Sequence, residues 1–187
     1  MNYKMYNPTS KEIKIVISEE AYLELLRNSR KFKLSTGNLA GFKKNNLIYI
    51  SQSKHFLGTD DVNQDLSFKD EHYIELMTWE EELFIKTPPL YVVGWYKIWN
   101  GEFIPRGYDI TTQMGKQGLN PEAFMIILNS NEITKVEPGL RIIRFKDYKN
   151  ETNYKIEFLE FKIQMIERRG ERTFIDILNE QVIKINV

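Results

Sequence analysis

Hydrophobic positions near the start of the chain follow first a strand period and then a helix period. Residues 12–18 alternate isoleucine with other side chains, which predicts a strand after a polar lead-in. Ser18 then fits a helix N-cap, because two glutamates follow it in the first turn, where the helix dipole favours negative charge. Apolar residues recur at helical spacing from there to about Arg30, so we expect a helix over this stretch.

The next segments predict a hairpin and a long helix. Residues 36–42 and 45–53 have the pattern of two strands joined by a Lys-Lys-Asn-Asn turn, and residues 54–67 are polar and irregular, as in a surface loop. A helix is expected over residues 69–86 and should end before the two prolines that follow. We assign its run "WEEEL", residues 79–83, to a solvated face. Its apolar face is expected to contain Tyr73, Leu76, Met77, Leu83 and Phe84.

The second half of the chain predicts strands with few helices. The segment "LYVVGWY", residues 90–96, lacks alternation and therefore predicts a strand buried on both faces. A short helix is expected near residues 110–118, ending at Gly118. Three strands and a C-terminal helical pattern are then expected at residues 123–129, 139–145, 154–165 and 170–185, the strand at 154–165 being half-exposed.

The order of these elements mixes hairpins with crossovers, and this order predicts an α/β fold with a mixed sheet flanked by helices. The length of 187 residues suits one domain. We place the main domain at residues 1–150 and assign residues 151–187 to a C-terminal strand and helix packed on the same domain.

Composition narrows the possible partners and compartments. Lys plus Arg and Asp plus Glu both number 26, so the chain gives no reason to expect nucleic acid or an anionic membrane as partner. The absence of cysteine excludes disulfides, thiolate nucleophiles and cysteine zinc sites, and it favours a reducing environment. No segment reaches the roughly 20 apolar residues that span a bilayer. We therefore expect a cytoplasmic protein.

The histidines and tryptophans give few signs of chemistry by themselves. His55 and His72, the only histidines, are expected on a loop and on the outer part of a helix, without metal-ligand spacing. Trp95 ends a buried strand and is expected in the core. Trp99 is expected in the following loop, either filling a cleft, the reading we favour, or standing exposed as an interface anchor.

Residues 91–129 resemble the MPN, or JAMM, family of zinc isopeptidases and their inactive relatives. The resemblance rests on "VVGWY", Gly101, "DITTQ" and "LNPEAFMIIL", in the order in which the family has its corresponding motifs. The upstream strand, helix, "GNLAG" strand, hairpin and long helix fit the family more loosely. The resemblance implies the MPN fold, which is similar to that of cytidine deaminases.

The resemblance also implies which positions would carry the family's chemistry. Active members use two histidines and an aspartate to hold zinc, a serine to support the oxyanion and a glutamate on an early strand to activate water. The histidines fall on Lys97 and Trp99, the serine on Arg106 and the aspartate on Asp109. The glutamate, three residues before Gly37, falls on Leu34.

These replacements predict a degenerate site without metal or other cofactor. A catalytic zinc needs about three protein ligands and an open position, whereas an ammonium has no lone pair to donate and leucine cannot accept a proton from water. Asp109 is expected to cap the short helix by accepting from N–H groups of its first turn. Lys97 or Arg106 either replaces the lost counter-charge beside Asp109 or extends into solvent.

The sequence therefore predicts a pseudoenzyme that acts as a scaffold or regulatory partner. A lysine directly after "VGWY" resembles the non-catalytic MPN subunits of the Abraxas type, and this likeness implies a heterodimer with an active zinc isopeptidase of a ubiquitin-like or proteasome-like system. Two alternatives stay open. The chain could be a divergent metal-dependent hydrolase that joins Asp109 to His55 or His72, or a homodimeric peptide-binding module.

Overall fold

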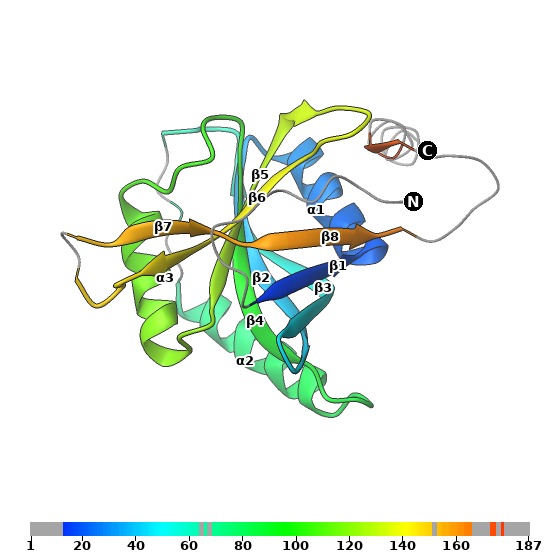
Figure 1. Cartoon of the computed structure of the whole chain (residues 1–187), viewed down its shortest axis with the longest axis vertical. Helices are drawn as coiled ribbons and strands as arrows, with labels where there is room; N and C mark the ends of the chain where they lie inside the picture. The colour runs from blue at the N-terminus through cyan, green and yellow to red at the C-terminus, as the bar shows by residue number, and fades with distance from the viewer. Residues whose placement is uncertain are drawn as a thin grey trace.

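A computed structural model describes residues 13–63, 66, 69–150, 153–165, 173, 174 and 177. Within these residues the chain forms an eight-stranded mixed sheet and three helices, which confirms the predicted α/β class (Figure 1). None of the helices in the described ranges is long and apolar enough to cross a membrane. The elements are β1 (Lys14–Ser18), α1 (Glu19–Lys31), β2 (Leu34–Lys44), β3 (Leu47–Thr59), α2 (Asp70–Phe84), β4 (Tyr91–Trp99), α3 (Tyr108–Leu119), β5 (Phe124–Ile133), β6 (Pro138–Lys146), β7 (Lys155–Phe158) and β8 (Glu160–Gln164).

The sheet has the order β7-β6-β5-β4-β2-β3-β1-β8, so its two end strands are neighbours in the sequence. Only Leu159 separates them, and its N–H donates to the carbonyl of Ile142 on β6 at 2.9 Å. In Figure 1, β7 and β8 run across the molecule almost as one line. The predicted single strand at residues 154–165 is therefore wrong: it is two strands that pair at opposite ends of the sheet.

Helix α1 packs against one face of the sheet and forms the larger core with it. Ser18 accepts a hydrogen bond from the N–H of Ala21 at 3.1 Å, which confirms the predicted N-cap. The apolar side of α1 contributes Ala21, Tyr22, Leu25 and Leu26, and these side chains contact buried residues from β1 to β6 and from β8. Phe174 and Ile177, in the C-terminal region, are buried in the same core.

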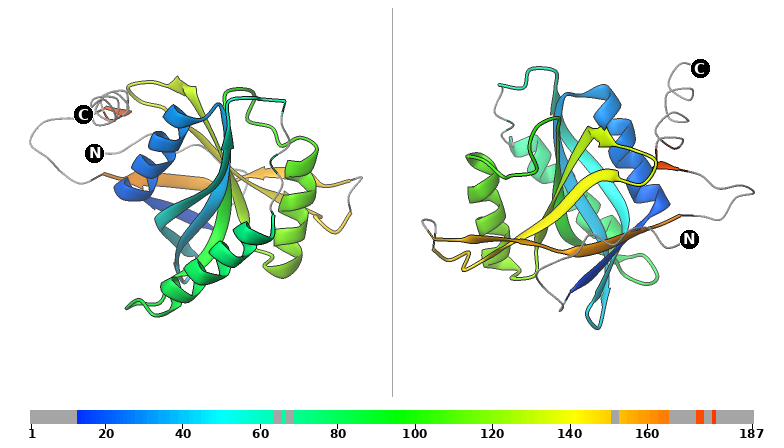
Figure 2. Two further views of the ribbon diagram at one scale, coloured as in Figure 1. Left: turned by 180° about the vertical axis from the view of Figure 1, so that it is seen from behind. Right: turned by 45° about the horizontal axis from the view of Figure 1, so that its top comes forward.

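Helices α2 and α3 lie on the other face of the sheet, across the central strands from α1 (Figure 2). Trp79 and Leu83 on α2 pack with Phe56, while Met114 on α3 packs with Trp95. The two helices thus form separate apolar clusters rather than one. The space between the clusters, over β2 and β4, contains the cavity described in the next section.

Several local expectations are corrected by long-range packing. Strand β3 continues to Thr59, where a loop was expected, because its polar stretch pairs with β2 as far as Leu34. Strand β4 continues through Lys97 to Trp99, and its first residue, Tyr91, is exposed rather than buried.

The faces of α2 also differ from the expectation. Leu83 is buried, as expected for the apolar face, but Trp79, which lies in the run assigned to solvent, is buried as well. Tyr73, Met77 and Phe84 are exposed, although the spacing placed them on the apolar side. The helix is apolar on two opposite sides, and periodicity alone does not show which side faces the sheet.

Candidate functional site

A cavity of about 340 Å³ lies above β2 and β4, on the face of the sheet that α2 and α3 cover. Its floor consists of side chains from alternate positions of the two antiparallel strands. The strand register sets opposite each other Leu34 and Trp99, Thr36 and Lys97, and Asn38 and Trp95. Because alternate residues of a strand point to the same face, all six side chains line the cavity.

The walls come from the two helices and from the segment after β3. Helix α3 contributes Asp109, Thr112 and Lys116, whose spacing of three and four residues places them on one side of the helix. Helix α2 contributes Tyr73 and Leu76. Val62, Asn63 and Leu66 line the cavity from the segment between β3 and α2. The site thus combines apolar and aromatic surface with a few charged groups, as small-molecule sites do.

All five positions that the family resemblance singles out line this one cavity. They are Leu34, Lys97, Trp99, Arg106 and Asp109. They come from β2, β4 and the start of α3, so only the fold brings them together. Trp99 is half-buried at the end of β4, not in a loop, and forms part of the cavity floor instead of filling the space.

Lys97 and Asp109 form an ion pair inside the site. The Nζ of Lys97 lies 2.7 Å from Oδ2 of Asp109, and the two side chains are only 20% and 8% exposed. The ammonium also lies over the ring of Trp99, 5.5 Å from its centroid. Of the two expectations for Lys97, the counter-charge is correct and extension into solvent is wrong.

Arg106 and the start of α3 differ from what the sequence suggested. The guanidinium of Arg106 pairs with Glu102 at the surface, so its side chain does not neutralise Asp109. Its backbone N–H instead donates to Oδ2 of Asp109 at 3.1 Å. The N-cap position belongs to Gly107, and Asp109 lies within the first turn, so the expected Asp109 cap is wrong. Asp109 is buried by its contacts with Lys97 and with the preceding turn.

A glutamine network fixes α3 against the sheet next to the cavity. The indole N–H of Trp95 donates to Oε1 of Gln113 at 2.7 Å, and Nε2 of Gln113 donates to the carbonyl of Ala123. Gln117 exchanges two hydrogen bonds with the backbone of Phe145. Trp95 belongs to "VGWY" and Gln113 to "DITTQ", so the two motifs are in contact and jointly position the α3 wall. Trp95 is buried, as predicted.

Asn38 and Lys116 form the other polar part of the cavity. The Nζ of Lys116 donates to Oδ1 of Asn38 at 3.3 Å, while Nδ2 of Asn38 is buried and has no hydrogen-bond partner among the residues that the structure describes. If the amide of Asn38 were flipped, its Nδ2 would face the ammonium of Lys116, and both groups are donors. The hydrogen bond from Lys116 therefore fixes the orientation of this amide. Burial lowers the pKa of Lys116, and the negative charge of Glu80 on α2 only partly offsets this effect.

The two histidines lie away from this cavity. His55 belongs to β3, not to a loop, where it stacks on Phe32 at 4.8 Å between ring centroids. Burial, and secondarily the charge of Lys31, lower its pKa. His72 lies in the first turn of α2, and its Nδ1 accepts from the N–H of Lys69. In the described ranges no three acidic or histidine side chains are grouped so that they could hold a metal ion.

Asn38 and Lys116 are the site residues that the sequence reasoning missed. Both had a usable signal: Asn38 is two and four residues beyond Thr36 and Leu34 on the same strand, and Lys116 is seven residues after Asp109 on the same helix. Strand and helix periodicity therefore place them beside positions that had already been singled out. The comparisons with known proteins add no further assignment, since neither a family model nor a curated protein matches the chain.

Proposed function

We propose that this chain is a catalytically inactive domain of the MPN type that acts as a scaffold or regulatory partner of an active zinc isopeptidase in a ubiquitin-like or proteasome-like system. The observation that carries the proposal is the Lys97–Asp109 ion pair. The family uses the corresponding aspartate as a metal ligand, and here its carboxylate already has a protonated amine at 2.7 Å. Metal binding would have to displace that ammonium from a site with little exposure to water.

The positions of the degenerate residues support the same proposal. Leu34 is distant in sequence from the four other positions, yet it shares a cavity with them. At the position of the catalytic glutamate, Leu34 offers no basic group, and Trp99 offers no ligand atom at the position of the second histidine. We infer that the chain kept the geometry of a hydrolase site and lost the groups that activate water.

The outer side of α2 supports the partner part of the proposal. Ile74, Met77, Phe84 and Ile85 are exposed on the side opposite the buried Trp79 and Leu83, and Tyr91 packs edge-on against Phe84 beside them. We call these five exposed residues, Ile74, Met77, Phe84, Ile85 and Tyr91, the α2 stripe. A helix that is apolar on two sides is typically covered on both.

The charges around the α2 stripe favour a different protein over a second copy of this chain. Glu80, Glu81 and Glu82 lie on α2 and are exposed, and the last turn of the helix has no basic residue. Two copies that met through this helix would bring acidic rims together, which is unfavourable. A partner with an apolar patch bordered by lysine or arginine would complement it.

The proposal is tested by affinity purification of the tagged protein from its own cells, with mass spectrometry of the proteins that accompany it. We expect a second MPN-type protein with intact His-x-His and Ser-x-x-Asp motifs at a ratio near one to one. Met77→Glu should abolish its recovery, whereas Leu119→Glu, at a residue exposed at the end of α3, should not. Recovery of the protein alone or only with itself would contradict the proposal and favour the homodimeric module.

A further inference from the structure

The charges that line the cavity are not balanced. Lys97, Arg106, Lys116 and Asp109 are the charged side chains among its described lining residues. Lys97 is neutralised by Asp109, and Arg106 is neutralised by Glu102. Lys116 has no carboxylate within ion-pair distance in the described part of the chain. Its ammonium instead contacts the neutral amide of Asn38. Among the described residues, Lys116 thus stands in the cavity without an ion-pair partner, although the more distant charge of Glu80 acts on it.

Asn38 shows a second unmet requirement at the same place. The residue is only 2% exposed, and its Nδ2 finds no acceptor within the described part of the chain. A buried donor without a partner is costly, and native structures contain few of them. The ammonium of Lys116 can donate three hydrogen bonds, and the described residues provide one acceptor, on Asn38. A negatively charged acceptor would therefore satisfy both the amide donor of Asn38 and the ammonium of Lys116.

The rest of the cavity is suited to an apolar body. Leu34 and Trp99 lie opposite each other at one end of the floor, and Tyr73 and Leu76 of α2 add further apolar and aromatic surface to the lining. The volume of about 340 Å³ falls in the lower part of the range typical of small-molecule sites. The strand register separates the two environments, because the Thr36 and Lys97 pair lies between the apolar end and the Asn38 end.

From this arrangement we propose that the cavity binds a small monocarboxylate with an aromatic or aliphatic body. The carboxylate accepts from Lys116 and from Nδ2 of Asn38, and the body lies toward Leu34 and Trp99. A monoanion fits because Lys116 is the single lining cation that has no ion-pair partner among the described residues, and a dianion such as a phosphate would bring an extra negative charge beside it. This inference does not depend on the proposed scaffold role.

Three tryptophans provide the readout. Trp95 and Trp99 line the cavity, whereas Trp79 is buried under α2 and does not line it. In an NMR titration that follows the indole N–H signals, Trp79 therefore serves as the internal reference. A Trp→Phe variant of each residue assigns the three signals. The probes are 3-phenylpropionate, its neutral isostere 3-phenylpropionamide, phenylphosphonate as the dianion and acetate as the carboxylate without a body.

We expect 3-phenylpropionate to shift the Trp95 and Trp99 signals with saturation and to leave Trp79 unchanged. The amide and acetate should each bind at least about tenfold more weakly, because each lacks one half of the recognition. Lys116→Met should weaken binding by about tenfold, Lys116→Arg should retain most of it, and Lys44→Met, at an exposed lysine outside the cavity, should have no effect. Asn38→Ala should weaken binding less than Lys116→Met.

Several results would overturn the inference. Equal binding of the acid and the amide would show that charge is not recognised, and tighter binding of phenylphosphonate would show that the ligand class is wrong. Unchanged affinity of a folded Lys116→Met protein would remove the assigned anion position. If none of the probes shifts either cavity tryptophan at millimolar concentration, the cavity is not a carboxylate site. A positive result together with failure of the purification experiment would leave a ligand-binding protein without the proposed scaffold role.

Discussion

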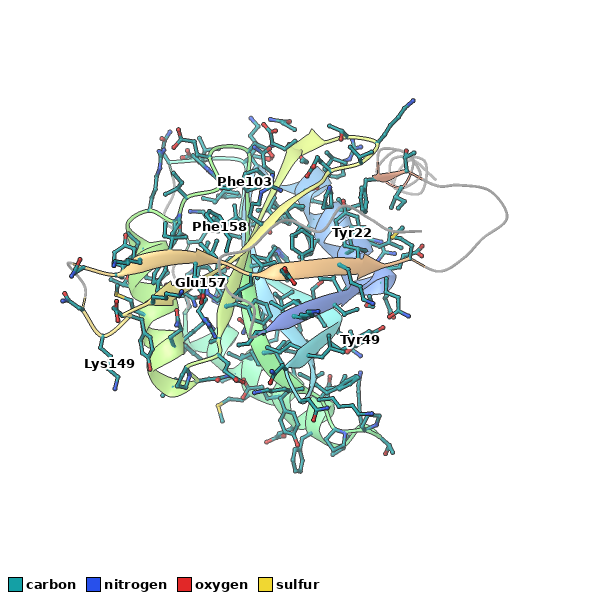
Figure 3. The ribbon with its side chains drawn as sticks, viewed as in Figure 1. Tyr22, Tyr49, Phe103, Lys149, Glu157 and Phe158 are labelled. Atoms are coloured by element: carbon teal, nitrogen blue, oxygen red, sulfur yellow. The ribbon has the colours of Figure 1, made fainter. Side chains whose placement is uncertain are left out.

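The two faces of the sheet differ in how completely their buried polar groups are paired. On the α1 face, the hydroxyl of Tyr22, labelled in Figure 3, donates to the carbonyl of Pro138 at 2.8 Å, and the hydroxyl of Tyr96 accepts from Asn28. Burial raises the pKa of both tyrosines far above the ordinary range, so they stay neutral. On the α2/α3 face, Nδ2 of Asn38 has no acceptor and Lys116 has no ion-pair partner among the described residues. The polar groups named on the first face are paired, whereas Asn38 and Lys116 on the second keep hydrogen-bonding capacity that the proposed ligand would satisfy.

The largest effect on the free energy of unfolding is expected when a leucine on each face is replaced by alanine. Leu25→Ala removes a fully buried side chain of α1 and should lower the free energy of unfolding by about 4 kcal/mol. Leu34→Ala, at a residue that borders the cavity, should cost about 1–2 kcal/mol, because part of its surface already faces empty space. Urea denaturation of both variants measures the difference. Equal losses would show that the two faces are packed alike.

The ion pair should have the next largest effect. Lys97→Met leaves the carboxylate of Asp109 buried without its counter-charge, and we expect a loss of about 3 kcal/mol in the free energy of unfolding. The double variant Lys97→Met with Asp109→Asn should recover most of this loss, since no buried charge remains. Arg106→Met is the control, because its ion pair is exposed and should contribute little. A Lys97→Met protein as stable as the parent would contradict the assigned role.

Replacing Lys116 should change the stability in the opposite direction from replacing Lys97. Because burial lowers its pKa, folding disfavours the charged form of this side chain. Lys116→Met removes that cost, so the free energy of unfolding should be unchanged or higher by up to about 1 kcal/mol. Thermal denaturation beside Lys97→Met tests the contrast. A clear loss of stability would mean that Lys116 has a structural role, and it would weaken the ligand proposal.

The smallest effect is expected from pH. His55 has a lowered pKa in the folded protein, chiefly because of burial, so the unfolded chain binds the proton more readily. Stability should be fully present above the unfolded value of about 6.5 and should decrease as pH falls through that value toward the lower folded pKa. Comparing the pH dependence of urea denaturation for the parent and for His55→Gln isolates this contribution. An unchanged dependence in the variant would assign the effect to other groups.

Much of the fold could be predicted because local signals and packing agree. Ser18 and its glutamates placed α1 correctly, and the apolar run that begins at residue 123 identified β5. The errors fall where distant pairing decides. The polar end of β3 is a strand only because β2 lies beside it, and residues 154–165 divide because their partners, β6 and β1, lie at opposite ends of the sheet.

The site was predicted in part, for a similar reason. Motif order located Lys97, Trp99 and Asp109, and the structure places them in one cavity. It could not locate Lys116, because that residue has no counterpart among the family's functional groups. Motif order also could not show whether Lys97 or Arg106 pairs with Asp109, because that depends on the direction in which each side chain points. Lys97 points into the cavity from β4, whereas Arg106 reaches Glu102 at the surface.

The pairing of β1 with β8 also decides when the sheet can be completed during synthesis of the chain. Strand β1 is synthesised first, yet one of its edges pairs with β8, whose residues leave the ribosome more than a hundred residues later. Until then, the strand leaves a row of backbone groups open to other chains, which is a known route to aggregation. Synthesis of β8, the last strand of the described sheet, closes this edge and ends the exposure.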